Sequence, residues 1–275
     1  MPAQALSRTP RPLTLLSALA ATAVLVGCSL FPPPREDDRP VARRVEALLP
    51  VDALLLGEQH DAQDHHKLEL EAVEALVARD QLAALAIEMA EEGRSTDKLG
   101  PKATEAQVQA ALEWNDRAWG WKDYGPAVMA AVRAGVPVVG ANLPLARIKT
   151  AMADVSLDAQ LNDSARATQQ EAVRSGHCNL LPESQIVPMT RVQIARDRSM
   201  AQAVVKAKQP GKTVLLIAGA GHATKLLGVP QQMPTDVSFK SIELKAGPGD
   251  ARDGYDGLWR TAALPEKDYC ASLRK

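Results

Sequence analysis

The feature that most constrains the fold is a set of short apolar runs, each ending in polar residues. The first run, Ala53–Leu56, is followed by Gly57, Glu58 and then His60. A run this short, bounded by charged residues, is typical of a buried strand. Gly57 lets the chain leave the strand in a conformation that other residues resist. We therefore expect Glu58 and His60 at the carboxyl end of this strand, where open α/β sheets keep their ligand sites.

Three later apolar runs repeat the pattern. Strands are predicted at Leu82–Met89, Val136–Ala141 and Thr213–Ala218, and they carry Glu88, Asn142 and His222 at or just after their ends. Helical patterns separate the runs, so the sequence predicts an α/β fold with a mostly parallel sheet flanked by helices. Parallel strands present their carboxyl ends along one edge, so these polar side chains are expected to converge.

The remaining chain supplies one further strand and several helices. Residues Val237–Leu244 alternate imperfectly and predict an edge strand, and Thr190–Lys208 predicts a long helix. We expect a single α/β domain over residues 41–275, with a smaller helical lobe inserted at about 95–185.

The amino-terminal segment has the pattern of a bacterial lipoprotein signal. Arg8 and Arg11 precede an apolar stretch, Leu13–Val26, that is too short to span a bilayer comfortably. The residues before Cys28 resemble a lipobox, which predicts a signal peptide at 1–27, lipidation of Cys28, palmitate among the acyl chains, and a proline-rich tether at 28–40. Ser29 after the cysteine favours the outer membrane, with the protein facing the periplasm or the cell surface.

Two cysteines remain once Cys28 is acylated. An even number in an oxidising compartment is compatible either with a disulfide between Cys178 and Cys270 or with two free thiols. The net charge of −1 gives no basic footprint for nucleic acid.

The expected convergence at the sheet edge suggests a cleft made of Glu58, His60, Glu88, Arg196 and His222. Two buried glutamates repel one another unless a cation lies between them, and Arg196 or a metal ion are the candidates. Gln193, Arg196, Asp197 and Met200 share one face of the predicted helix, which either faces the cleft or forms a solvated stripe. His65 and His66 begin a helix and are expected to be solvated.

Several short motifs, taken together in order, resemble the ChaN family of the haem-binding uptake, Tiki-like superfamily. They are Gly57-Glu58-Gln59-His60, Glu88, Trp121-x-x-Tyr124, Asn142-Leu143-Pro144, His177-Cys178, Gln193-x-x-Arg196-Asp197-x-x-Met200-Ala201 and Gly219-x-Gly-His222. The resemblance implies an α/β core with a helical lobe, and haem binding by an iron-regulated lipoprotein.

The resemblance also implies a ligand set and partners. Its cofactor-binding residues would be Glu58, His60, Glu88, Tyr124, Asn142, Arg196 and His222, with a tyrosine or histidine as the axial haem ligand. The only tyrosines in the chain are Tyr124, Tyr255 and Tyr269. Expected partners are haem, the outer membrane, a haem receptor and a second copy of the chain.

Two functions remain open from the sequence. The first is a haem-binding protein of haem and iron uptake, which is a binding protein rather than an enzyme. The alternative is a metal-dependent hydrolase related to the Tiki and erythromycin esterase groups. In that case Glu58, His60 and His222 would hold a divalent metal, and a carboxylate such as Glu88 would activate water.

Overall fold

A computed structural model of the chain describes residue 1 and residues 39–271. The expected signal peptide apart from residue 1, nearly all of the expected tether and the predicted lipidation site Cys28 lie outside the described residues. No helix in the described part of the chain is long and apolar enough to cross a membrane.

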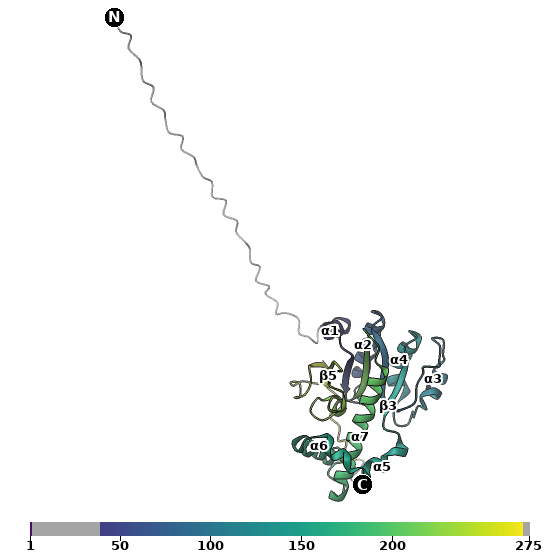
Figure 1. Cartoon of the computed structure of the whole chain (residues 1–275), viewed down its shortest axis with the longest axis vertical. Coiled ribbons are helices and arrows are strands. Elements are labelled where there is room, and N and C mark those ends of the chain that lie inside the picture. Colours follow the sequence, from purple (N-terminus) through teal and green to yellow (C-terminus); the bar gives the residue numbers. More distant parts are fainter. Residues whose placement is uncertain (2–38, 272–275) are drawn as a thin grey trace. The chain divides into compact units, whose positions relative to one another are not determined.

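A parallel sheet forms the centre of the fold, which confirms the predicted class (Figure 1). Six strands of the described region hydrogen-bond in the order β3-β2-β4-β1-β5-β6. They are β1 (Ala53–Glu58), β2 (Leu82–Glu91), β3 (Val138–Asn142), β4 (Thr213–Gly219), β5 (Phe239–Ala246) and β6 (Gly257–Thr261). The central strands β1 and β4 are buried along their whole length, as their mainly apolar sequences favour.

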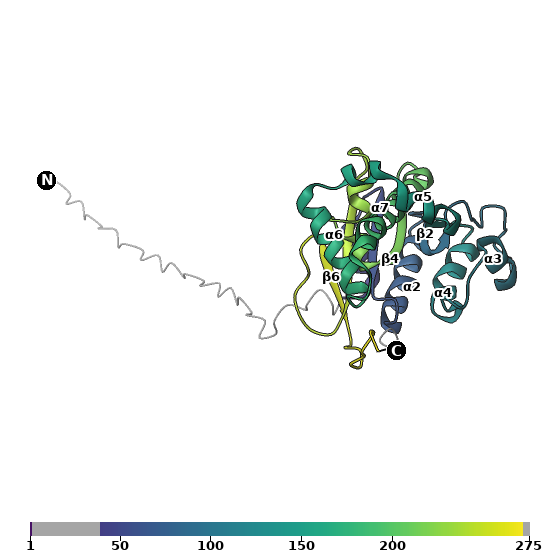
Figure 2. The same ribbon diagram turned by 90° about the horizontal axis from the view of Figure 1, so that it is seen from below.

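Helices connect the strands. They are α1 (Val41–Leu48), α2 (Gln63–Val77), α3 (Glu105–Leu112), α4 (Trp121–Arg133), α5 (Ile148–Ala153), α6 (Asp163–Gly176), α7 (Glu183–Ala207) and α8 (Ala220–Ala223). Short 3-10 turns lie at η2 (Leu145–Arg147), η3 (Val155–Gln160) and η4 (Val229–Gln232). Helices α3 and α4 lie side by side (Figure 2). Helices α5 and α6 each pack on α7, at the end of the domain opposite α1 (Figure 1).

The two faces of the sheet have separate hydrophobic cores. Leu54 and Leu56 of β1 point into a core completed by α1, α2 and α4. Leu55, between them, points to the other face and packs in a core with Met200 of α7. Because side chains alternate along a strand, Glu58 continues the Leu54 and Leu56 row and faces α2 and α4 at the end of β1.

The structure corrects three expectations about the elements. The range 95–185 contains β3, so the helices there form two connections, α3–α4 and α5–α6, rather than one insertion. Strand β5, predicted to be an edge strand, is internal, because β6 pairs with its outer side. The apolar run Leu258-Trp259 in β6 is too short for its periodicity to predict a strand. Helix α7 begins at Glu183, seven residues before the predicted start.

A disulfide ties the carboxyl-terminal tail to the end of α6. Cys178 and Cys270 are bonded, with their Cα atoms 5.7 Å apart. The bond brings the neighbouring Tyr269 back to the domain, where its hydroxyl donates a hydrogen bond to Asp61 at 2.9 Å.

Candidate functional site

Glu58 ends β1 and lies almost completely buried among polar side chains. His60 Nδ1 lies 2.9 Å from its Oε1, and the hydroxyl of Tyr124 donates to the same oxygen at 2.8 Å. His66 Nε2 lies 3.1 Å from Oε2. Burial opposes ionisation, but the contacts and charges of His60 and His66 outweigh it and lower the pKa of Glu58 to about 2. Glu58 is therefore ionised at neutral pH.

Gly57 permits this arrangement by its size. An added Cβ would lie 2.8 Å from the Cβ of Ala223 and 3.0 Å from the Cα of Ala220, both in α8. The residue belongs to β1 and its φ is outside the left-handed region, so the expectation of an unusual backbone conformation is wrong. Gly57 is required because α8 packs directly on the strand.

Glu88 occupies the adjoining position near the end of β2. Its Oε2 accepts a hydrogen bond from the backbone N–H of Gly219 at 2.7 Å, where β4 ends. His60 Nε2 lies 3.9 Å from Oε2, and His222 Nε2 lies 3.7 Å from Oε1. One carboxylate therefore faces an imidazole on each side.

His222 is held in place by Asp197 of α7. Its Nδ1 lies 2.6 Å from Oδ1 of the buried Asp197. Burial lowers the pKa of His222, but Asp197 and Glu88 outweigh this and raise it to about 9. Burial raises the pKa of Asp197 to about 6. At pH 7 both members of the pair are consequently charged.

These contacts form one chain of alternating carboxylates and imidazoles, which we call the carboxylate–imidazole network. It consists of Tyr124, Glu58, His60, Glu88, His222 and Asp197. His60 lies between the two glutamates, and its pKa is raised: burial lowers it, but Glu58 and Glu88 outweigh that effect. The predicted convergence of Glu58, His60, Glu88 and His222 is thus present in the structure, with Tyr124 joined to it.

Arg196 and Asn142 do not make the contacts that the sequence suggested. Arg196 forms no ion pair with a carboxylate in the described part of the chain, and its Nε is buried without a hydrogen-bond partner. It acts on His222 only through its charge, which opposes protonation. Asn142 ends β3, and its backbone carbonyl accepts a hydrogen bond from the N–H of Glu92. The expectation that Arg196 neutralises the glutamates is therefore wrong, because histidines occupy that position.

Helix α2 contributes residues that the sequence analysis missed. His65 and His66 are buried rather than solvated, and His65 Nδ1 accepts the N–H of Gln59 at 3.0 Å. One turn later, Glu69 is also buried, and burial together with Glu58 raises its pKa well above the ordinary range. His65 and Glu69 lie four residues apart on the side of α2 that also buries Val73. That spacing was a usable signal for the burial of both side chains.

Aromatic rings contact both His60 and His66. The His60 ring meets Trp119 edge-on at 4.9 Å between centroids, and His66 meets Tyr124 at 4.5 Å. Beside them lies a hollow of about 390 Å³. It is lined by His60, Asp61, Gln63, His66, Ala118, Trp119, Gly120, Asp123 and Tyr124. We call it the His60 hollow.

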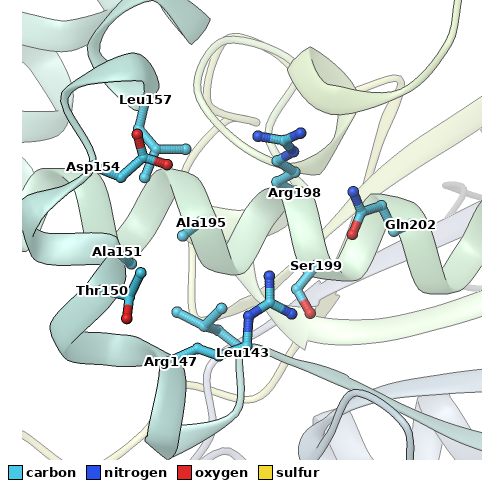
Figure 3. Close-up of a pocket in the computed structure, with 10 residues that line it drawn as sticks. All are labelled: Leu143, Arg147, Thr150, Ala151, Asp154, Leu157, Ala195, Arg198, Ser199 and Gln202. Atoms are coloured by element: carbon cyan, nitrogen blue, oxygen red, sulfur yellow. The ribbon is translucent and has the colours of Figure 1, made fainter.

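Two further hollows lie on other surfaces. One of about 790 Å³ is bordered by Arg94, Lys98, Lys206 and Lys208. The other, of about 210 Å³, lies between α5 and α7 (Figure 3). Figure 3 shows Arg147 at the base of this space, with its guanidinium directed toward Ser199.

Comparison with known proteins places this fold and site in a family. The family model described as haem-binding uptake, Tiki superfamily, ChaN matches residues 44–233. The chain belongs to the ChaN family. The matched range runs from α1 to the last 3-10 turn and contains every residue of the carboxylate–imidazole network. No curated protein sequence matched this ChaN-family chain significantly.

Solved structures share the fold. ChaN of Campylobacter jejuni, solved in a study of cofacial heme binding, matches with a TM-score of 0.64 and 22% identity, over 76% of this chain and 87% of that one. The type III effector HopBA1 matches with a TM-score of 0.54 and 17% identity, over 85% of this chain and 97% of that one. At these identities the two structures establish the α/β fold of this ChaN-family member.

Proposed function

We propose that this protein binds haem at the His60 hollow as a step in haem uptake. Membership of the ChaN family, shown by the match over residues 44–233, is the observation that carries the proposal. The Campylobacter jejuni relative, whose structure is described by its cofacial heme binding, is in agreement with it.

The residues of the hollow suit a haem. A haem site needs an apolar or aromatic wall, an axial ligand for the iron and cations for the propionates. Trp119 supplies an aromatic wall beside His60. The His60 side chain is 40% exposed, so its imidazole is accessible although Glu58 holds Nδ1.

A second axial donor lies at the rim. Tyr124 is buried and donates its hydroxyl to Glu58, and the partly buried Tyr255 donates its hydroxyl to the carbonyl of Ala220. Tyr269, by contrast, is 56% exposed. Tyr269 reaches the hollow through its hydrogen bond to Asp61, and Lys267 lies 4.8 Å from its ring centroid. The tail fixed by the disulfide thus brings a phenol and an ammonium group to the rim, as iron ligand and propionate partner.

The other hollows fit a haem less well. The 790 Å³ hollow has cations, but its lining includes no histidine, tyrosine, methionine or cysteine, the side chains that ligate haem iron. The 210 Å³ hollow in Figure 3 is smaller than the roughly 300 Å³ at which ligand pockets begin.

Titration of the full chain with haemin tests the proposal. We expect a saturable Soret shift at micromolar protein, with His60→Ala or Tyr269→Phe changing the spectrum according to which side chain ligates the iron. Tyr255→Phe is the matched control, since the Tyr255 hydroxyl is donated to the carbonyl of Ala220 and the residue does not line the hollow. Absence of any Soret shift in the unsubstituted protein would exclude haem binding.

We further propose that the protein is an outer-membrane lipoprotein. The apolar stretch Leu13–Val26 before Cys28, with Ser29 behind it, supports this location. Mass spectrometry of the exported protein should find the chain beginning at an acylated Cys28, and Cys28→Ala should release it from the membrane fraction. An unmodified Cys28 in the mature chain would refute the anchor.

One observation favours a second candidate function, a metal-dependent hydrolase. His60 Nε2 and His222 Nε2 both face Glu88, while Glu58 and Asp197 hold their Nδ1 atoms. Carboxylates that orient imidazoles in this way accompany many metal sites. In this candidate function Glu88 would be the ligand and Glu58 the supporting residue, the reverse of the sequence-based assignment. A bound divalent ion would supply Lewis-acid activation of a substrate carbonyl.

Metal analysis of the purified protein tests this candidate. Stoichiometric metal that is lost in both His60→Ala and His222→Asn, with hydrolysis lost in parallel, would support it. Metal-free protein that still binds haem would exclude it.

A further inference from the structure

A second buried cluster lies behind the network, where α2 crosses the end of β1. It consists of Glu58, His66 and Glu69, which are 2%, 7% and 1% exposed. One ligand atom from each lies within 4.8 Å of the others. The three residues come from two elements whose crossing brings them together.

Five polar atoms of this cluster are buried without hydrogen bonds. Both carboxylate oxygens of Glu69, Oε2 of Glu58 and both ring nitrogens of His66 have no hydrogen-bond partner in the described part of the chain. His66 Nε2 lies 3.1 Å from Glu58 Oε2, but not in hydrogen-bonding geometry. A buried polar group left without a hydrogen bond destabilises the fold by about 1–3 kcal/mol, and a charged one by more. A ligand bound to these atoms would remove that destabilisation.

A proton alone satisfies only part of the cluster. Shared between Glu69 and Glu58, it provides a partner for one oxygen of each. The second oxygen of Glu69 and the nitrogens of His66 stay unsatisfied. A divalent cation between the three side chains satisfies one atom of each at once, and it neutralises two carboxylates that otherwise repel.

We propose that Glu58, His66 and Glu69 form a binding site for a first-row divalent metal ion. Two carboxylates and one imidazole are a donor set that suits Zn²⁺, Mn²⁺ or Fe²⁺ rather than the all-oxygen shells of Ca²⁺. Three protein ligands leave a coordination position open, as in catalytic zinc sites. This site differs from the pair of imidazoles at Glu88, with which it shares only the carboxylate of Glu58.

The surroundings support such a site. Tyr124 donates to Oε1 of Glu58 and leaves Oε2 directed toward His66, so a neighbouring residue orients the ligand. His66 also lines the His60 hollow, which gives an ion a route from solvent to a cluster that is otherwise closed.

Calorimetric titration of the metal-stripped full chain with Zn²⁺ alone, repeated with Mn²⁺, tests the proposal. We expect one equivalent to bind and to raise the melting temperature. Glu69→Gln keeps the shape of the side chain and removes the ligand charge, so it should weaken binding at least tenfold. Glu71→Gln is the matched control, because Glu71 is an exposed glutamate on the same helix and should bind as the unsubstituted protein does.

A second variant separates this site from the imidazole pair at Glu88. His66→Gln should also lose the metal, whereas His222→Asn should retain it. Circular dichroism and melting of each metal-free variant establish that loss of binding is not loss of folding. The proposal is overturned if neither ion binds stoichiometrically, or if binding survives Glu69→Gln or His66→Gln unchanged; loss in His222→Asn instead would place the metal at the imidazole pair. Haemin titration is a separate measurement, so failure of haem binding leaves this test unaffected.

Discussion

The buried pair of His222 and Asp197 should make the protein less stable as pH rises above neutrality. The folded-state pKa of His222 is about 9, against an ordinary value of 6.5. A raised histidine pKa contributes stability that is complete below the unfolded value and is lost as pH rises through the folded value. The loss therefore falls between about pH 6.5 and 9, and raising the pKa from 6.5 to about 9 corresponds to about 3 kcal/mol. His222 is well buried, so solvent screening reduces this figure little.

The measurement is urea denaturation of the full chain at half-unit steps from pH 6 to 10, with a chelator present to remove metals. The double variant Asp197→Asn, His222→Gln is the reference, because two amides can replace the hydrogen bond without titrating. Groups outside the carboxylate–imidazole network titrate alike in both proteins, so their contributions cancel in the difference. We expect the unsubstituted protein to lose about 3 kcal/mol relative to the reference across this range.

A single substitution is an unsuitable reference. With His222 alone replaced, Asp197 stays buried without its partner, and its own titration would enter the same pH range. If the difference between the unsubstituted protein and the double variant is flat from pH 6 to 10, His222 does not gain its proton affinity from the network, and the electrostatic reasoning is wrong.

Two further predictions concern stability. The double variant Cys178→Ser, Cys270→Ser should lower the free energy of unfolding, measured by urea titration, by about 4–5 kcal/mol, because the disulfide spans 92 residues of sequence. A urea midpoint equal to that of the unsubstituted protein under non-reducing conditions would show that the bond does not constrain the chain. Gly57→Ala should cost about 1–3 kcal/mol, because its Cβ would meet Ala223 at 2.8 Å, whereas Gly100→Ala has open space and should cost less than 1 kcal/mol. Equal melting temperatures for the two alanine variants would contradict the close packing of α8 on β1.

The sequence by itself determined the class of the fold and the edge that carries the site. Short apolar runs ending in Glu58, Glu88 and His222 are local patterns, and a buried strand needs little more than such a run. Once the strands are parallel, their carboxyl ends must meet, so the convergence of these side chains followed from polarity alone. The order of the strands did not follow, because β4 pairs between β1 and β2 from more than 120 residues away along the chain.

Tertiary structure alone decided which groups neutralise the buried carboxylates. Arg196 and Asp197 are neighbours on α7, yet a helix turns about 100° per residue. Asp197 therefore meets His222, while Arg196 makes no ion pair among the described residues. Likewise, His66 and Glu69 reach Glu58 only because α2 crosses the end of β1. Periodicity indicates which side of a helix is buried, but the angle and position at which that helix packs decide which charges meet.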